Sequence, residues 1–164
     1  MRVYLPGTIA LLERLQREGA VPAGPGYAVT DALRAWYVDG DEEELEYAAM
    51  TAAARASLRL LAAEPEPARE RALRVVLAAD VPDARLSPAD GDAQDPGVIN
   101  ITAEVRRVDL ASLHVDEAAA RPTVLAALSA LAAGEGDPDG GLAIDAVEDF
   151  DLLWYAVQEL GDLL

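Results

Sequence analysis

Apolar and polar residues alternate along parts of the chain, and this period of two predicts β-strands. The clearest case is Val98–Val105, where Ile99, Ile101 and Val105 fall on one side and polar residues on the other. Such alternation is typical of a half-exposed antiparallel strand. Together with β-branched apolar segments, it predicts about four strands, at Arg2–Leu5, Ala72–Ala79, Val98–Val105 and Ser112–Val115.

Other stretches repeat apolar residues every three or four positions, which predicts helices. The longest is Asp39–Leu61, with acidic residues at its start, where the helix dipole favours negative charge, and alanines through its middle. Its apolar residues fall on two faces, so we expect a central packing helix with Ala49–Leu60 in the core. Shorter helices are predicted at Thr8–Glu18, Thr30–Tyr37, Pro122–Ala132 and Val147–Leu160. Thr8 and Thr30 are expected to cap the first two, and Asp39 or Asp41 the long helix. We expect Ile9, Leu12 and Leu15 of the first helix, and Trp154 of the last, to face the core.

Segments rich in Gly, Pro and Asp separate these elements and predict loops at Gly19–Gly26, 80–97 and 134–141, the last two of them mobile. We expect one domain spanning residues 1–164. The pattern predicts an α+β fold, with a small, mainly antiparallel sheet of about four strands and helices packed on one face. The order of strands and helices favours a ferredoxin-like or pseudo-duplicated topology.

The idea of a duplication comes from a weak internal match. Placing Tyr155 on Tyr47 also superposes Leu153 on Leu45, with acidic residues before both, and the same offset aligns two predicted strands. Two interpretations stay open. The chain is duplicated, or two amphipathic helices start alike because helix N-termini favour acidic residues.

The composition limits the cellular compartments and the kinds of catalysis that we expect. The 164 residues include no cysteine, which excludes thiol catalysis and Cys-based zinc sites. The first residues enter a strand-like segment without the basic and apolar regions of a signal peptide, and no apolar run approaches the about 20 residues that span a bilayer. We therefore expect a cytoplasmic protein that does not enter membranes.

The charge is strongly negative, at −17, and all thirteen basic residues are arginine. Binding to nucleic-acid phosphates needs basic patches, so this composition argues against direct contact with the phosphate backbone. From Pro122 onward the chain holds nine acidic residues and no arginine. Three interpretations of such a surface stay open: a docking site for a basic partner, a nucleic-acid mimic, or a solvated face that keeps the protein soluble.

The candidate partner-binding residues surround the start of the long helix: Trp36, Tyr37, Asp41, Glu42, Glu43 and Glu44. Tryptophan beside acidic residues suits an anchor for a basic protein or peptide. The alternative is structural, with the aromatics in the core and the carboxylates placed at a helix start. Two adjacent large aromatics cannot both face the same core, so one of them is expected at the surface.

The candidate ligand or metal residues are Asp80, Asp83 and His114. The two aspartates follow the most apolar predicted strand, where a pair of carboxylates can hold a divalent cation. His114 is the only histidine and precedes two acidic residues, an arrangement suited to acid–base chemistry. The alternative interpretations are a strand-terminating turn and a surface histidine.

Four segments carry a resemblance to a known family: RVYLP, DGDEEELEYAAMTAAARASLRL, VVLAADVPDA and EDFDLLWYAVQEL. Together they resemble an uncharacterised family, a domain of unknown function, of small acidic proteins from high-GC Gram-positive bacteria. The resemblance implies a bacterial cytoplasmic protein. It implies no activity, ligand or catalytic residue.

Two functional hypotheses follow. The first is a non-enzymatic protein-interaction or regulatory module that binds an unidentified, basic protein partner through its acidic surface and needs no cofactor. The second is a small enzyme or ligand- or metal-binding domain that uses dispersed carboxylates near Asp80, Asp83 and His114. Catalytic motifs such as a phosphate-binding loop or a nucleophile elbow are absent from the sequence, which favours the first.

Overall fold

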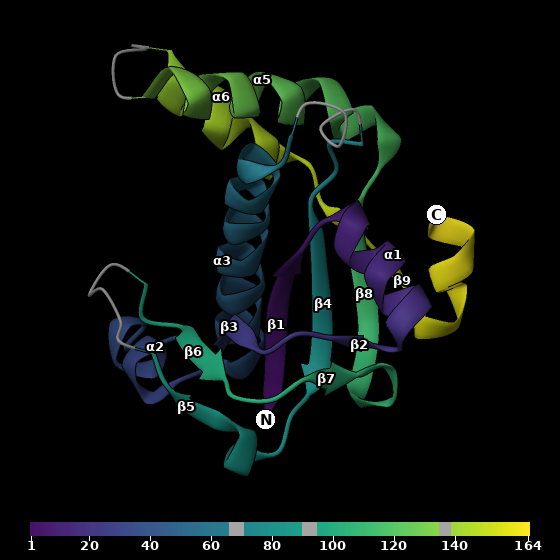
Figure 1. The fold of residues 1–164 in the computed structure, drawn as a ribbon. Coiled ribbons are helices and arrows are strands. Elements are labelled where there is room, and N and C mark those ends of the chain that lie inside the picture. Colours follow the sequence, from purple (N-terminus) through teal and green to yellow (C-terminus); the bar gives the residue numbers. More distant parts are fainter. Residues whose placement is uncertain (66–70, 90–94, 135–138) are drawn as a thin grey trace.

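The computed structural model describes residues 1–65, 71–89, 95–134 and 139–164. Its centre is a seven-stranded antiparallel sheet in the order β5-β6-β3-β1-β4-β8-β9 (Figure 1). A separate two-stranded ribbon joins β2 and β7. The strands are β1 (Arg2–Gly7), β2 (Ala20–Val21), β3 (Gly24–Ala28), β4 (Val75–Asp80), β5 (Leu86–Pro88), β6 (Val98–Ile101), β7 (Val105–Arg106), β8 (Leu110–Asp116) and β9 (Leu152–Tyr155).

One face of the sheet is covered by α2 (Asp31–Trp36) and α3 (Glu42–Ala63). Both helices start at predicted caps, because the Thr30 hydroxyl accepts a hydrogen bond from the Leu33 amide and the Asp41 carboxylate accepts one from the Glu44 amide. The core of this face joins even-numbered residues of β1 and β4 to residues of α3: Tyr4, Val76 and Ala78 pack with Leu45, Ala49 and Ala53. The alanines of α3 therefore allow the helix to lie close to the sheet.

The opposite face is covered by α1 (Ile9–Glu18) and the 3-10 helix η6 (Val157–Leu163). Thr8 caps α1 as predicted, and the predicted apolar positions of this helix, Ile9, Leu12 and Leu15, are buried. They pack with odd-numbered strand residues such as Leu5 and Leu77.

A third apolar cluster lies at the C-terminal end of α3. There α5 (Arg121–Ala133) and α6 (Gly140–Ala146) cross the end of the long helix (Figure 1). Val124 and Leu128 of α5 pack against Leu58 and Leu61 of α3 and against Val147, which follows α6.

The α+β class is confirmed, but three finer predictions are wrong. The main sheet has seven strands rather than about four. Helices cover both of its faces, because the central strands β1 and β4 alternate apolar residues toward two different cores. The fold does not match the ferredoxin-like β-α-β-β-α-β topology, since the main sheet has seven strands in the order β5-β6-β3-β1-β4-β8-β9.

The predicted final helix, Val147–Leu160, is also wrong. In this segment the structure has strand β9, flanked only by short 3-10 turns. β9 pairs with β8 in the register His114↔Trp154 and Val115↔Leu153. Trp154 is 63% exposed rather than core. Because Tyr155 lies in a strand and Tyr47 in a helix, the two segments of the supposed repeat do not share a structure.

Part of the predicted loop Gly19–Gly26 forms strands instead. Gly26 lies within β3, where a Cβ atom would lie 2.8 Å from Cγ1 of Val3. Glycine is therefore required by the close approach of β1, not by a turn. Val98–Val105 divides into β6 and β7, with Ile99, Ile101 and Val105 buried as predicted.

The two segments predicted as mobile loops also contain regular structure. A 3-10 turn (Asp83–Arg85) and β5 lie within 80–97, and α6 begins at Gly140. Residues 90–94 and 135–138 of these segments lie outside the described residues. In α3, Leu60 is 43% exposed, which corrects its predicted place in the core.

Candidate functional site

The partner-binding candidates gather around an open groove at the start of α3. We define the acidic–aromatic groove by Tyr37, Val38, Asp39, Asp41, Glu43, Glu44 and Tyr47, which line a hollow of about 1030 Å³. Its residues come from the turn after α2 and from the first two turns of α3. The groove thus lies where one short helix ends and the long helix begins. Arg55 lines the same hollow, and its guanidinium is paired with the Glu148 carboxylate.

Two of its carboxylates also hold the helix start together. Asp41 accepts a hydrogen bond from the Glu44 amide at 2.9 Å, and Glu44 accepts one from the Asp41 amide at 3.1 Å. This reciprocal arrangement is a capping box, which fixes both carboxylates beside the helix dipole. Asp41 and Glu44 therefore have a structural role whether or not a partner binds.

Two other carboxylates of the groove have no such role. Within the part of the chain that the structure describes, Asp39 and Glu43 make no hydrogen bond or ion pair, and both are exposed. Apolar and aromatic side chains line the same groove: Val38 is 84% exposed and Tyr47 61% exposed. Exposed aromatic residues next to free carboxylates are an arrangement suited to arginine or lysine side chains.

The structure brings together four of the six predicted partner residues. Tyr37, Asp41, Glu43 and Glu44 line the groove, whereas the Glu42 carboxylate is bound by the Arg34 guanidinium at 2.8 Å. Trp36 is 65% exposed but lines a different, largely apolar hollow with Val29, Leu86 and Val98. Val38, Asp39 and Tyr47 also line the groove, although none of them was among the predicted partner-binding residues.

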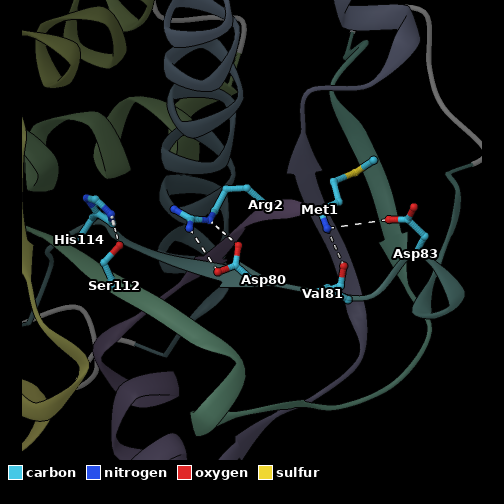
Figure 2. A network of polar contacts seen from close by, with 7 residues as sticks. All are labelled: Met1, Arg2, Asp80, Val81, Asp83, Ser112 and His114. Carbon is cyan, nitrogen blue, oxygen red and sulfur yellow. Dashed lines mark hydrogen bonds and ion pairs between the residues drawn. The ribbon is translucent and has the colours of Figure 1, made fainter.

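Asp80 and His114 lie on the neighbouring strands β4 and β8, and Asp83 lies in the 3-10 turn after β4, but the three side chains point to different partners (Figure 2). Arg2 donates two hydrogen bonds to the Asp80 carboxylate, from Nε at 2.9 Å and from Nη2 at 3.2 Å. This contact lowers the pKa of Asp80. Asp83 lies 3.8 Å from the Met1 amino group, which also donates to the Val81 carbonyl.

His114 makes a contact that the sequence analysis did not predict. Its Nε2 lies 2.9 Å from the Ser112 hydroxyl, which donates in the tautomer carrying the imidazole proton on Nδ1 (Figure 2). Burial, and to a smaller extent the charge of Arg2, lowers the pKa of His114. Burial therefore favours the neutral form of the imidazole, which can accept a hydrogen bond from the hydroxyl.

Among the described residues, no three His, Asp or Glu side chains gather as ligands of a metal ion would. Asp80, Asp83 and His114 each have their own nearby group, so they do not form one constellation. A signal for Ser112 was present, because residues two apart on a strand share a face. The pairing of Arg2 with Asp80 depends on the β1–β4 register, so no pattern in the sequence near either residue could predict it.

A comparison with protein families gives a match over the whole chain. Residues 1–164 match the model of a family of unknown function, DUF6912. The chain belongs to DUF6912. This confirms the expected membership of a family of unknown function, while the bacterial source stays a prediction. No curated protein and no solved structure matches this DUF6912 chain.

One further finding concerns membranes. None of the helices in the described parts of this DUF6912 protein is both long and apolar enough to cross a bilayer.

Proposed function

We propose that this DUF6912 protein is a non-enzymatic interaction module of the bacterial cytoplasm, which binds a basic segment of a partner protein in the acidic–aromatic groove. The observation that carries the proposal is the free, exposed pair of carboxylates, Asp39 and Glu43, beside exposed Tyr47. A regulatory role would follow from competition for that partner.

Electrostatics and apolar contact both favour this occupant. The chain has a net charge of −17, so it attracts basic proteins over distances up to the Debye length, about 8 Å at physiological ionic strength. Within the groove, a guanidinium can pair with Asp39 or Glu43 while its flat face lies on a tyrosine ring. Val38 adds apolar surface that an arginine stem can cover.

The test is capture of the partner from cells that produce the protein, followed by mass spectrometry. Wild-type protein should retain a basic protein at low salt and release it at high salt. The Asp39→Asn/Glu43→Gln variant should lose the same protein. The control, Glu104→Gln/Glu117→Gln, removes two exposed acidic charges elsewhere and should retain it. Equal retention by both variants would contradict the groove as the binding site.

The second candidate function is a small enzyme that uses the polar residues near Asp80, Asp83 and His114. It is favoured by the Ser112–His114 contact, since a hydroxyl bound to a neutral imidazole is the start of a nucleophile–base pair. Against it, Ser112 is only 6% exposed. We therefore prefer the interaction module.

A fluorophosphonate probe tests this alternative directly. An activated Ser112 would be labelled in wild-type protein, labelled less in His114→Gln and not labelled in Ser112→Ala. If wild-type Ser112 stays unlabelled, acyl transfer at this pair is removed from consideration.

A further inference from the structure

The two edges of the seven-stranded sheet are built differently. At one edge, β5 has three residues and ends with Pro88, which has no N–H to offer to another strand. At the other edge, β9 has the sequence LLWY, with no proline and no charge. Natural proteins commonly protect edge strands with proline or charged residues, which β9 lacks. Among the described residues no strand pairs with the outer edge of β9.

The side chains of β9 leave apolar surface uncovered on both faces of the sheet. Trp154 lies opposite His114, which in turn lies opposite Val76 of the α3-side core, so Trp154 is on the α3 side. Leu153 lies opposite Val115 and therefore on the α1 side. Trp154 is 63% exposed and Leu153 41% exposed. A strand added at this edge would cover both.

The charges around β9 indicate which strand fits. The exposed carboxylates of Asp149 and Asp151 precede it, those of Glu159 and Asp162 follow it, and no basic residue occurs after Arg121. A second copy of this chain would bring the same negative charges and be repelled. A strand that is apolar at its centre and basic at both ends matches the edge in shape and in charge.

We propose that β9 accepts an extended segment of a partner protein, apolar in the middle and basic at its ends, as an eighth strand of the sheet. Backbone hydrogen bonds to β9 would supply affinity, and contacts with Trp154 and Leu153 would supply specificity. The start of β9 lies near the acidic–aromatic groove, since Leu152 and Tyr47 line one small cavity, but the proposal rests on the edge strand and does not depend on the function proposed for the groove.

The first test compares two synthetic peptides of equal charge. Arg-Arg-Val-Ile-Val-Ile-Arg-Arg can add as a strand, whereas the peptide with proline in place of both isoleucines lacks two of the N–H groups. Titration calorimetry should give an affinity about tenfold lower for the proline peptide, and only the first peptide should slow hydrogen exchange of the β9 amides. Equal affinities would mean attraction by charge alone and would overturn the proposal.

The second test uses protein variants with the same change in charge. Leu153→Lys places a positive charge on the edge strand and should weaken binding of the strand-forming peptide about tenfold or more. Leu142→Lys adds the same charge at an exposed position of α6 and should weaken it about twofold or less. Trp154→Ala, checked for an unchanged circular dichroism spectrum, should weaken binding without any change in charge.

Sedimentation of the free protein tests whether a second copy of the chain, rather than a partner protein, pairs with β9. We expect a monomer in both wild type and Leu153→Lys. A wild-type dimer that Leu153→Lys dissociates would show that a second copy covers β9, and that result would overturn the choice of partner. Loss of a captured partner from the Asp39→Asn/Glu43→Gln variant concerns only the groove, so the two proposals fail separately.

Discussion

Ser57, in the middle of α3, connects the long helix to two strands through one buried hydroxyl. Its Oγ donates to the Gly7 carbonyl at 2.7 Å and accepts from the Val75 amide at 2.9 Å. These groups lie at the end of β1 and the start of β4. The sequence offered no signal for this role, because a serine among helical alanines looks like any small residue.

Replacing Ser57 with Ala should destabilise the protein by about 2–3 kcal/mol, since it leaves a buried carbonyl and a buried amide without their partner. Urea unfolding measures the change. Ser129→Ala is the matched control, because Ser129 is an exposed helical serine that bonds only the Leu125 carbonyl, and it should cost less than about 0.5 kcal/mol. Similar losses for both variants would contradict the bridging role.

His114 should make stability depend on pH near neutrality. Burial lowers its pKa in the folded protein, so over the interval between the folded and unfolded pKa values the unfolded chain binds more protons. The free energy of unfolding should therefore fall as pH decreases from about 7 through the unfolded value, near 6.5.

The measurement is urea unfolding of wild type and His114→Gln at pH 7.5 and 5.5. At the lower pH the free energy of unfolding of wild type should fall relative to that of the variant, because glutamine does not titrate. Carboxylates such as Asp80, whose pKa is lowered by Arg2, lose their contribution at more acidic pH and affect both proteins alike. A difference that does not change with pH would contradict a lowered pKa.

At the scale of elements, local sequence predicted helix starts well and strand partners poorly. Thr8, Thr30 and Asp41 cap their helices as expected, since capping involves only residues within one turn. The segment around Trp154 has helical spacing, yet it forms β9 because β8 offers it an edge to pair with. That edge depends on distant parts of the chain, so the spacing alone could not reveal it.

The same limit applied to the candidate sites. The acidic residues of the groove were recognised because they are neighbours in sequence, whereas Tyr47 was assigned to an apolar face of α3 although it is 61% exposed. Arg2 was not connected with Asp80, because only the pairing of β1 with β4 brings them into contact.

Two glycines of β3 provide a test of how closely the strands and their side chains approach. A Cβ atom on Gly26 would lie 2.8 Å from Val3 and 3.1 Å from Ile101, whereas one on Gly24 would have no heavy atom within 4 Å. Gly26→Ala should therefore destabilise the protein by about 1–3 kcal/mol. Gly24→Ala should be neutral or stabilising by up to about 1 kcal/mol, as thermal or urea unfolding would show. Equal effects would contradict the close approach.

At the scale of the whole molecule, one buried ion pair joins the sheet to the chain returning from α6. Asp116 at the end of β8 binds the Arg74 guanidinium in a bidentate contact, at 2.7 and 2.9 Å, and their side chains are 0% and 6% exposed. Arg74 also donates to the Phe150 carbonyl, just before β9. The position of the edge strand therefore depends on this pair.

Asp116→Asn should destabilise the protein by about 3–5 kcal/mol, because it leaves the buried guanidinium without a counter-charge. A double-mutant cycle tests the pair. The variant Arg74→Met/Asp116→Leu should lose less stability than the sum of the losses in Arg74→Met and in Asp116→Leu, as urea unfolding of these three variants and wild type would show. Additive losses would mean that the two side chains act independently.

Both tryptophans of the chain are on the surface, one in α2 and one in β9, at 65% and 63% exposure. Their fluorescence emission is therefore expected near that of indole in water even in the folded protein, and unfolding should change it little. The single-tryptophan proteins Trp36→Phe and Trp154→Phe would each report on one surface. A ligand that covers β9 should shift the emission to shorter wavelength only when Trp154 is kept, so the protein contains its own local probe of the sheet edge.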